Sequence, residues 1–196
     1  SISIPESVTR IGQNAFYGTV GLTSISLPSS VTSIGDRAFS NATSLVSISL
    51  PVGLTTIGAS AFEVTALTSI TIPEGVISLP SFVFSNARAL TSVSIPSSVV
   101  SIDRNTFDGA TALTNIAVAS SSQSFSSIDG VLFSKDAKVL LDYPLGKSAT
   151  SYSIPDGVTR IGDSAFDYVT SLTSIIIPDG LTSIGDSAFA AAASIT

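Results

Sequence analysis

The sequence predicts a mainly β, right-handed solenoid in which coils of about 23 residues stack along one axis. One marker is a phenylalanine column whose regular steps are 22 or 23 residues: Phe16, Phe39, Phe62, Phe84 and Phe107, then Phe166 and Phe189. A second marker is a proline column with nearly the same steps: Pro5, Pro28, Pro51, Pro73 and Pro96, then Pro155 and Pro178. Two independent markers that stay in phase over seven copies indicate a repeat architecture.

The repeat is clearest in residues 22–39, LTSISLPSSVTSIGDRAF. Leu22, Ile25 and Leu27 can point inward while serines between them point outward, because side chains alternate along a strand. Pro28 lacks the N–H of a continuing ladder and ends the strand. Each coil therefore contributes one strand to a parallel sheet, and the L-x-x-I-x-L pattern is typical of leucine-rich repeats.

The second half of the repeat returns along the opposite face. Val31 and Ile34 predict another short extended segment. Asp36 is expected to N-cap a single helical turn that carries Phe39 into the interior. A glycine column follows the extended segment, but Pro80 replaces glycine in one coil. Since proline cannot adopt a positive φ, we expect these glycines to relieve crowding between coils.

The unbroken repeat predicts one solenoid domain over residues 1–196. A single coil leaves both of its faces open, so stability is expected to come from stacking. The chain begins and ends within a repeat and shows no signal-peptide pattern, which favours a segment of a longer protein. No run reaches the roughly 18 apolar residues of a spanning helix, so no membrane insertion by this segment is expected.

The composition narrows the functional class. The 196 residues are 44% hydrophobic and 11% charged, and they include no Cys, His, Met or Trp. Because the net charge is −6, we expect no nucleic-acid partner. Without His or Cys, and with no nucleophile, phosphate-loop or zinc motif, we expect no enzyme and no cofactor.

One coil, at about 119–155, is longer than the others by thirteen residues. Its apolar runs 131–133 and 139–141 flank the polar stretch 134–138, which predicts a hairpin. All three lysines lie in this insertion. Either it projects to contact a ligand, or it covers an exposed sheet edge and its lysines serve solubility. The candidate contacts are Lys135, Asp136, Lys138 and Lys147.

The phrases LTSISLPSSVTSIGDRAF and SIIIPDGLTSIGDSAF and the variant SIDGVLFSKDAKVLLDYPLGK resemble the BspA-like leucine-rich repeat proteins. The resemblance covers essentially the whole chain. It implies an extracellular or cell-surface protein, associated with adhesion and with binding of host or matrix proteins, and it implies no catalytic residues. This family commonly has cysteine three residues after the phenylalanine, whereas this chain has small residues such as Ala42 and Ala87 there.

Outward hydroxyls form the candidate binding face for a protein or glycan ligand. Its members are Ser24, Ser26, Ser47, Ser49, Ser69, Thr71, Ser92, Ser94, Ser151, Ser153 and Ser174. A solvated face whose hydroxyls bond one another is the simpler interpretation. The face also lacks the Tyr, Trp or Arg anchors typical of a binding hot spot.

Acidic columns offer a possible metal site, since Asp156 and Asp179, like Asp163 and Asp186, are one repeat apart. Turn and capping roles explain these aspartates more simply, and we expect no metal.

Two classes of function remain open at this point. The first is a non-enzymatic binding or adhesion module. The second is a structural spacer, or a solenoid that self-associates end to end through unpaired strands. Ice binding by the hydroxyl rows is a remote variant of the structural class, because serine dominates the rows and Asn115, Ala117 and Ile176 interrupt them.

Overall fold

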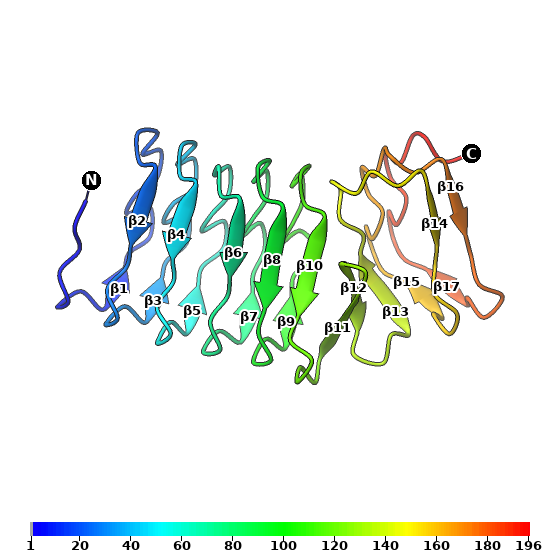
Figure 1. Ribbon diagram of the computed structural model, residues 1–196, viewed down its shortest axis with the longest axis horizontal. Helices are drawn as coiled ribbons and strands as arrows, with labels where there is room; N and C mark the ends of the chain where they lie inside the picture. Colours follow the sequence, from blue (N-terminus) through cyan, green and yellow to red (C-terminus); the bar gives the residue numbers. More distant parts are fainter. Residues whose placement is uncertain (1) are drawn as a thin grey trace.

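The computed structural model describes residues 2–196 as a single row of coils, with the two ends of the chain at opposite ends of the row (Figure 1). These residues form strands and turns and contain no helix. They therefore include no helix that is long and apolar enough to cross a membrane. Each regular coil contributes two short strands, one to each side of the row, as the apolar pattern predicts.

The first side, which we call the serine face, consists of strands rich in outward serines. They are β2 (Ser24–Ser26), β4 (Ser47–Ser49), β6 (Ser69–Thr71), β8 (Ser92–Ile95), β10 (Asn115–Val118), β14 (Ser151–Ser153) and β16 (Ser174–Ile176). The strands pair in parallel as β2–β4, β6–β8–β10 and β14–β16. The register is one repeat, so that Ser24 lies opposite Ser47 and Ser69 opposite Ser92.

The opposite side, which we call the second face, carries the shorter strands. They are β1 (Arg10–Ile11), β3 (Ser33–Ile34), β5 (Thr56–Ile57), β7 (Ser78–Leu79), β9 (Ser101–Ile102), β13 (Val139–Asp142), β15 (Arg160–Ile161) and β17 (Ser183–Ile184). Parallel pairing joins β1–β3–β5, β7–β9 and β13–β15–β17. This face is thus interrupted twice, after β5 and after β9.

The phenylalanine column forms a continuous interior stack, as the spacing predicts. The ring centroids of Phe16 and Phe39 are 5.1 Å apart, and those of Phe39 and Phe62 are 5.6 Å apart. The stack continues through Phe84 to Phe107 with centroid distances of 5.9 Å. Neighbouring rings are within 8° of parallel. Because each ring is covered by the ring of the next coil, burial is shared between coils and no coil is complete alone.

The expected single helical turn around Phe39 is wrong in detail. Amide groups of Ala38 and Ser40 donate to carbonyls three residues earlier, but those of Arg37 and Phe39 donate to Ala59 and Ala61 of the next coil. Arg37 has a φ of 53°, which a helix interior excludes. Alternate amides thus extend the ladder between coils. Local helix propensity does not predict this pairing, because the hydrogen bonds between coils form only when the coils stack.

The glycine column is confirmed as a response to crowding. A Cβ at Gly35 would lie 2.7 Å from the backbone nitrogen of Gln13 in the preceding coil. A Cβ at Gly58 would overlap the backbone of Asp36. Gly35 and Gly58 are not among the glycines with positive φ. Neighbouring coils approach so closely at this corner that a side chain here would push them apart.

The long coil contains the predicted hairpin, formed by β12 (Val131–Ser134) and β13. An additional strand that the sequence pattern did not reveal, β11 (Phe125–Ile128), pairs antiparallel with β12. The carbonyl of Gly130 accepts from Ile116 N at 3.0 Å, and the Ser127 hydroxyl donates to Ile116 O at 2.6 Å. The insertion therefore covers the edge of β10, which supports the edge-covering interpretation.

Tyr143 takes the phenylalanine position in the long coil and starts a second aromatic stack. Its ring centroid lies 5.2 Å from that of Phe166, which in turn lies 5.1 Å from that of Phe189. The buried core correspondingly divides into two clusters, and β12 contributes to both, with Leu132 in the first and Val131 and Phe133 in the second. The sequence held a signal for this role, because Tyr143 precedes Phe166 by one repeat.

Candidate functional site

The serine face presents its hydroxyls to solvent. Of the eleven predicted residues, Ser92 is half-buried and all the others are exposed. None of the eleven makes a side-chain hydrogen bond within residues 2–196. The expectation that these hydroxyls bond one another is therefore wrong. The backbone hydrogen bonds between strands, and not contacts between hydroxyls, set the distance from each serine to the next in its row. Their hydrogen-bonding capacity is available to water or a ligand.

Threonines that directly precede strands of either face behave differently. Thr55 Oγ1 donates to Thr32 O at 3.1 Å, and Thr91 Oγ1 donates to Thr68 O at 2.9 Å. Thr182 Oγ1 donates in the same way to Thr159 O at 2.9 Å. These hydroxyls connect successive coils, whereas the serine-face hydroxyls do not. The threonine hydroxyls therefore have a structural role, whereas the serine-face hydroxyls remain available at the surface.

Two shallow depressions lie over the serine face. One, of about 400 Å³, is lined by Ser47, Ser49 and Ser69 together with Val46 and Val52. The other, of about 460 Å³, extends from Thr71 and Ser94 to Ala117. Val52 has 89% of its surface exposed. These valines give the face apolar contact points that the sequence reasoning missed, because they lie just outside the serine rows.

The insertion residues have local partners. Asp136 Oδ1 accepts from Ser134 Oγ at 2.7 Å and from Lys138 N at 3.1 Å, which closes the β12–β13 turn. The Ser134 bond holds the pKa of Asp136 below its usual value. Lys135 Nζ donates to Ser120 O at 3.3 Å, and Lys138 Nζ donates to Gly157 O at 3.1 Å. Asp136 thus has a structural role in the turn.

The remaining lysine candidate, Lys147, lies farther along the insertion. Its amide donates to Pro144 O at 3.3 Å, and its side chain is half-buried.

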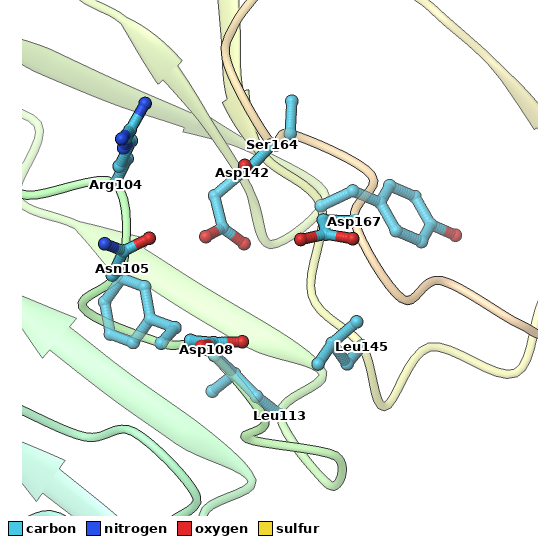
Figure 2. Close-up of a pocket in the computed structure, with 11 residues that line it drawn as sticks. Arg104, Asn105, Asp108, Leu113, Asp142, Leu145, Ser164 and Asp167 are labelled. Carbon is cyan, nitrogen blue, oxygen red and sulfur yellow. The ribbon is translucent and has the colours of Figure 1, made fainter. Parts of the chain in front are cut away.

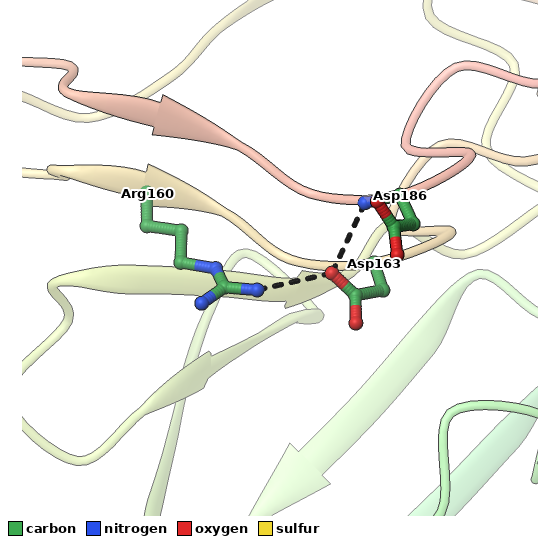
Figure 3. A network of polar contacts seen from close by, with 3 residues as sticks. All are labelled: Arg160, Asp163 and Asp186. Carbon is green, nitrogen blue, oxygen red and sulfur yellow. Dashed lines mark hydrogen bonds and ion pairs between the residues drawn. The ribbon is translucent and has the colours of Figure 1, made fainter.

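The acidic column at Asp163 and Asp186 also connects coils (Figure 3). Asp163 Oδ1 accepts from the Asp186 backbone N at 3.2 Å and from Arg160 Nη2 at 3.0 Å. In the same way, Asp36 Oδ1 accepts from Ala59 N of the next coil at 2.9 Å. This bond replaces the expected N-cap on the turn of Asp36 itself. Within residues 2–196, no group of three or more acidic, Cys or His side chains has the geometry to hold a metal ion.

A small acidic pocket of about 60 Å³ lies where the two aromatic stacks meet. Figure 2 shows the carboxylates of Asp108, Asp142 and Asp167 directed toward one space, with the Arg104 side chain extending away from them. Asp167 Oδ1 is buried and has no hydrogen-bond partner among the described residues. We refer to these residues as the junction pocket.

The environment of the junction pocket disfavours ionised carboxyls. Burial, followed by the nearby charge of Asp108, raises the pKa of Asp142 to about 7. The same two causes raise the pKa of Asp167. These shifts arise because carboxylates lose hydration and repel one another where few donors compensate them.

Sequence reasoning missed the junction pocket, although one signal pointed to it. The position before the stacked aromatic residue is uncharged in the other coils: it carries the exposed Ala15 and the buried Ala38, Ala61, Val83, Thr106, Ala165 and Ala188. Asp142 is the acidic exception in this column. The pocket brings carboxyl groups together beside Arg104 and Ser164, and these carboxyl groups can bind protons or attract a cation.

Comparison with known proteins agrees with the architecture. A family model described as BspA type leucine-rich repeat region, in six copies, matches residues 1–114 and 145–196. The unmatched residues between these ranges contain β11, β12 and β13 of the long coil. No curated protein matches the chain.

Solved structures of bacterial leucine-rich repeat proteins share the fold. A leucine-rich repeat protein from Eubacterium ventriosum is 31% identical, with a TM-score of 0.84 over 93% of this chain and 48% of its own. The pneumococcal vaccine antigen PcpA is 28% identical, with a TM-score of 0.74 over 94% of this chain and 54% of its own.

A leucine-rich cell surface protein from Faecalibacterium prausnitzii is 30% identical, with a TM-score of 0.52 over 91% of this chain and 61% of its own. The chain thus spans about half to three-fifths of the length of these three proteins. The repeat pattern, the stacked aromatic column and the family match lead to one conclusion: the chain belongs to the BspA-type leucine-rich repeat family.

Proposed function

We propose that this chain is a non-enzymatic protein-binding module of a secreted or cell-surface protein and that it acts in adhesion. The observation that carries the proposal is the serine face, an exposed row of hydroxyls without internal hydrogen-bond partners. Solenoids commonly bind partners along such extended faces. One similar structure is described as a cell surface protein and another as a vaccine antigen, which supports a surface location.

The experiment measures binding of the chain to surface-coated matrix proteins and to glycan arrays. Ser47→Arg and Ser69→Arg, introduced together, place two bulky cations in the depression beside Val52. The matched control, Thr56→Arg with Ser78→Arg, alters two exposed hydroxyl residues of adjacent coils on the second face. Loss of binding in the first pair alone supports the proposal, and equal binding by both pairs would contradict it.

A structural alternative has its own observation. Ile184 has 53% of its surface exposed, whereas Ile34, Ile57 and Ile161 in the same column are at most 3% exposed. This apolar coil face could associate with a second copy of the chain. Sedimentation velocity across a concentration range tests the alternative, which predicts oligomers that Ile184→Asp abolishes.

Ile176→Asp provides the control for that measurement, because Ile176 is 59% exposed but lies on the serine face opposite Ser153. A strictly monomeric chain would leave the binding module as the supported role.

A further inference from the structure

The second face is open at one place, between β9 and the long coil. Within the pair β7–β9, Val100 N donates to Ile77 O and Asp103 N donates to Leu79 O, each at 2.9 Å. On β9 itself, the carbonyls that would pair with a following coil in the same way are Val100 O and Ile102 O. Neither accepts a backbone hydrogen bond from a described residue of the long coil. Strand β9 thus presents a free row of acceptors.

The two interruptions of this face differ in width. Strands β5 and β7 approach to within 8 Å between Cα atoms, so that break is closed. No Cα of β9 lies within 8 Å of a Cα of β11, β12 or β13. Adjacent strands in a sheet lie about 4.8 Å apart, so an inserted strand needs about 9.6 Å between its two neighbours. The second gap is therefore wider than the spacing of paired strands, and β9 has no strand partner on this side among the described residues.

A groove of about 320 Å³ occupies this gap. Phe125, Leu132 and Leu141 contribute apolar surface to it. Ile102 is part of its β9 side. These residues provide pockets for alternate side chains of an extended peptide, as in known cases of strand addition.

The charges around the groove select a basic occupant. Asp103, Asp142 and Asp163 line it with Arg104 and Arg160, and Arg160 is already paired with Asp163. The adjoining junction pocket shares Arg104 and Asp142 with the groove and adds Asp108 and Asp167. Five aspartates therefore surround two arginines. Complementary charge favours a lysine or arginine side chain at this place.

We propose that this groove binds an extended, basic segment of a partner protein, which adds to β9 as a further parallel strand. Amides of the segment donate to Val100 O and Ile102 O, an apolar side chain contacts Phe125 and Leu141, and a cationic side chain reaches the carboxylates of the junction pocket. The proposal deepens the proposed binding role but uses a surface separate from the serine face.

The chain itself provides a template for the probe. In the long coil, Thr159 N donates to Lys138 O at 2.8 Å and Gly162 N donates to Leu140 O at 2.7 Å, the two acceptors that correspond to Val100 O and Ile102 O. A synthetic, fluorescein-labelled peptide GVTRIGKS copies residues 157–164 with lysine in place of Asp163. Its binding to the intact chain is measured by fluorescence anisotropy. The result expected is saturable binding.

A first control tests the strand pairing. The same peptide with N-methyl groups on the amides that correspond to Thr159 and Gly162 keeps its charge and side chains but loses both donors. We expect at least a tenfold weaker affinity. Equal affinity of the two peptides, or no binding of the parent peptide at millimolar concentration, would overturn the proposal.

A second control tests the position and the charge. Asp108→Lys reverses an exposed carboxylate of the junction pocket, whereas Asp179→Lys makes the same charge change on the exposed terminal turn. We expect about fivefold weaker binding for Asp108→Lys and no change for Asp179→Lys at 0.15 M salt. Equal loss in both variants would indicate attraction to net charge alone and would overturn the proposal.

The serine-face pair Ser47→Arg and Ser69→Arg separates this inference from the proposed function. These variants are expected to bind the peptide normally even where they lose the matrix ligand. Loss of peptide binding in the serine-face pair would place the peptide on that face and overturn the groove assignment.

Discussion

The regular coils before residue 119 and the long coil that follows use the same interior in different ways. In the regular coils, the aromatic position keeps one residue type and one role, as in Phe62 between Phe39 and Phe84. In the long coil, Tyr143 replaces the phenylalanine, and Asp142 replaces the small residue before it. Repetition therefore gives uniform packing, whereas its interruption collects partly buried charge and leaves β9 paired on one side only, with β7.

The comparison shows where a solenoid can acquire specific chemistry. Within the regular stack backbone hydrogen bonds join successive coils, as Arg37 and Phe39 show, and a buried substitution has to fit neighbours on both sides. At the insertion, the regular ladder of the second face is interrupted after β9, and side chains such as Asp108 and Asp167 face a shared space. The same interruption thus produces both the junction pocket and the open groove.

The largest expected effect comes from breaking the regular stack. Phe62→Ala removes a fully buried ring that lies between two others, and we expect the free energy of unfolding to fall by about 3–5 kcal/mol. Phe16→Ala, at the half-buried end of the stack, should lower it by about 1–2 kcal/mol. Urea denaturation followed by circular dichroism measures both. Equal losses would mean that stacking on two sides adds no stability.

The long coil should respond to pH through Asp142. Its pKa rises from 3.8 in the unfolded chain to about 7 in the fold, so the native state binds more protons between these values. The free energy of unfolding therefore decreases as pH rises from about 4 to about 7. Asp142→Asn should flatten this dependence and raise stability at pH 8, by at most about 4 kcal/mol, the limit that a shift from 3.8 to about 7 sets.

Urea titrations at several pH values check this expectation. Asp108→Asn serves as the control, because removal of the exposed neighbouring charge should reduce the pH dependence only in part. An Asp142→Asn variant that keeps the full pH dependence would assign the titration to another group.

A smaller effect separates crowded from open corners of the coils. Gly58→Ala forces a Cβ against the backbone of Asp36, and we expect a loss of about 1–2 kcal/mol. Gly12→Ala is the matched control, because no atom lies within 4 Å of the added Cβ. Thermal unfolding compares the two variants. A neutral Gly58→Ala would show that the coils can separate at this corner without cost.

The smallest effect is expected at the surface of the second face. Arg160 and Asp163 form an ion pair at 3.0 Å with side chains 49% and 36% exposed. Exposed pairs of this kind contribute little, so Arg160→Ala should change the free energy of unfolding by less than about 0.5 kcal/mol. A denaturation series in low and high salt measures it. A larger, salt-insensitive loss would point to packing by the arginine stem.

Residue spacing made most of the fold predictable. Phe39 and Phe62 could be placed in one interior column because a 23-residue period returns each residue to the same position in the next coil. The hairpin of β12 and β13 followed from two apolar runs around a polar turn. The helical turn at Asp36 was wrong, since local propensity does not include hydrogen bonds to a neighbouring coil.

The candidate site was predictable only in part. The serine face followed from strand alternation, and its residues lie outward as expected. The junction pocket joins Asp108, Asp142 and Asp167, which are far apart in the sequence and belong to different coils. No periodic pattern links them, because the insertion between the first two residues shifts the register.

The sequence by itself determined the period, the alternation of apolar and polar positions and the family, because these depend on residues recurring at a fixed distance along the chain. Only the tertiary structure decided how wide the gap beside β9 is, which carbonyls remain unpaired and which carboxyls lose their hydration. Those properties depend on how the thirteen extra residues pack between two coils, and the packing of an irregular segment is set by its three-dimensional neighbours.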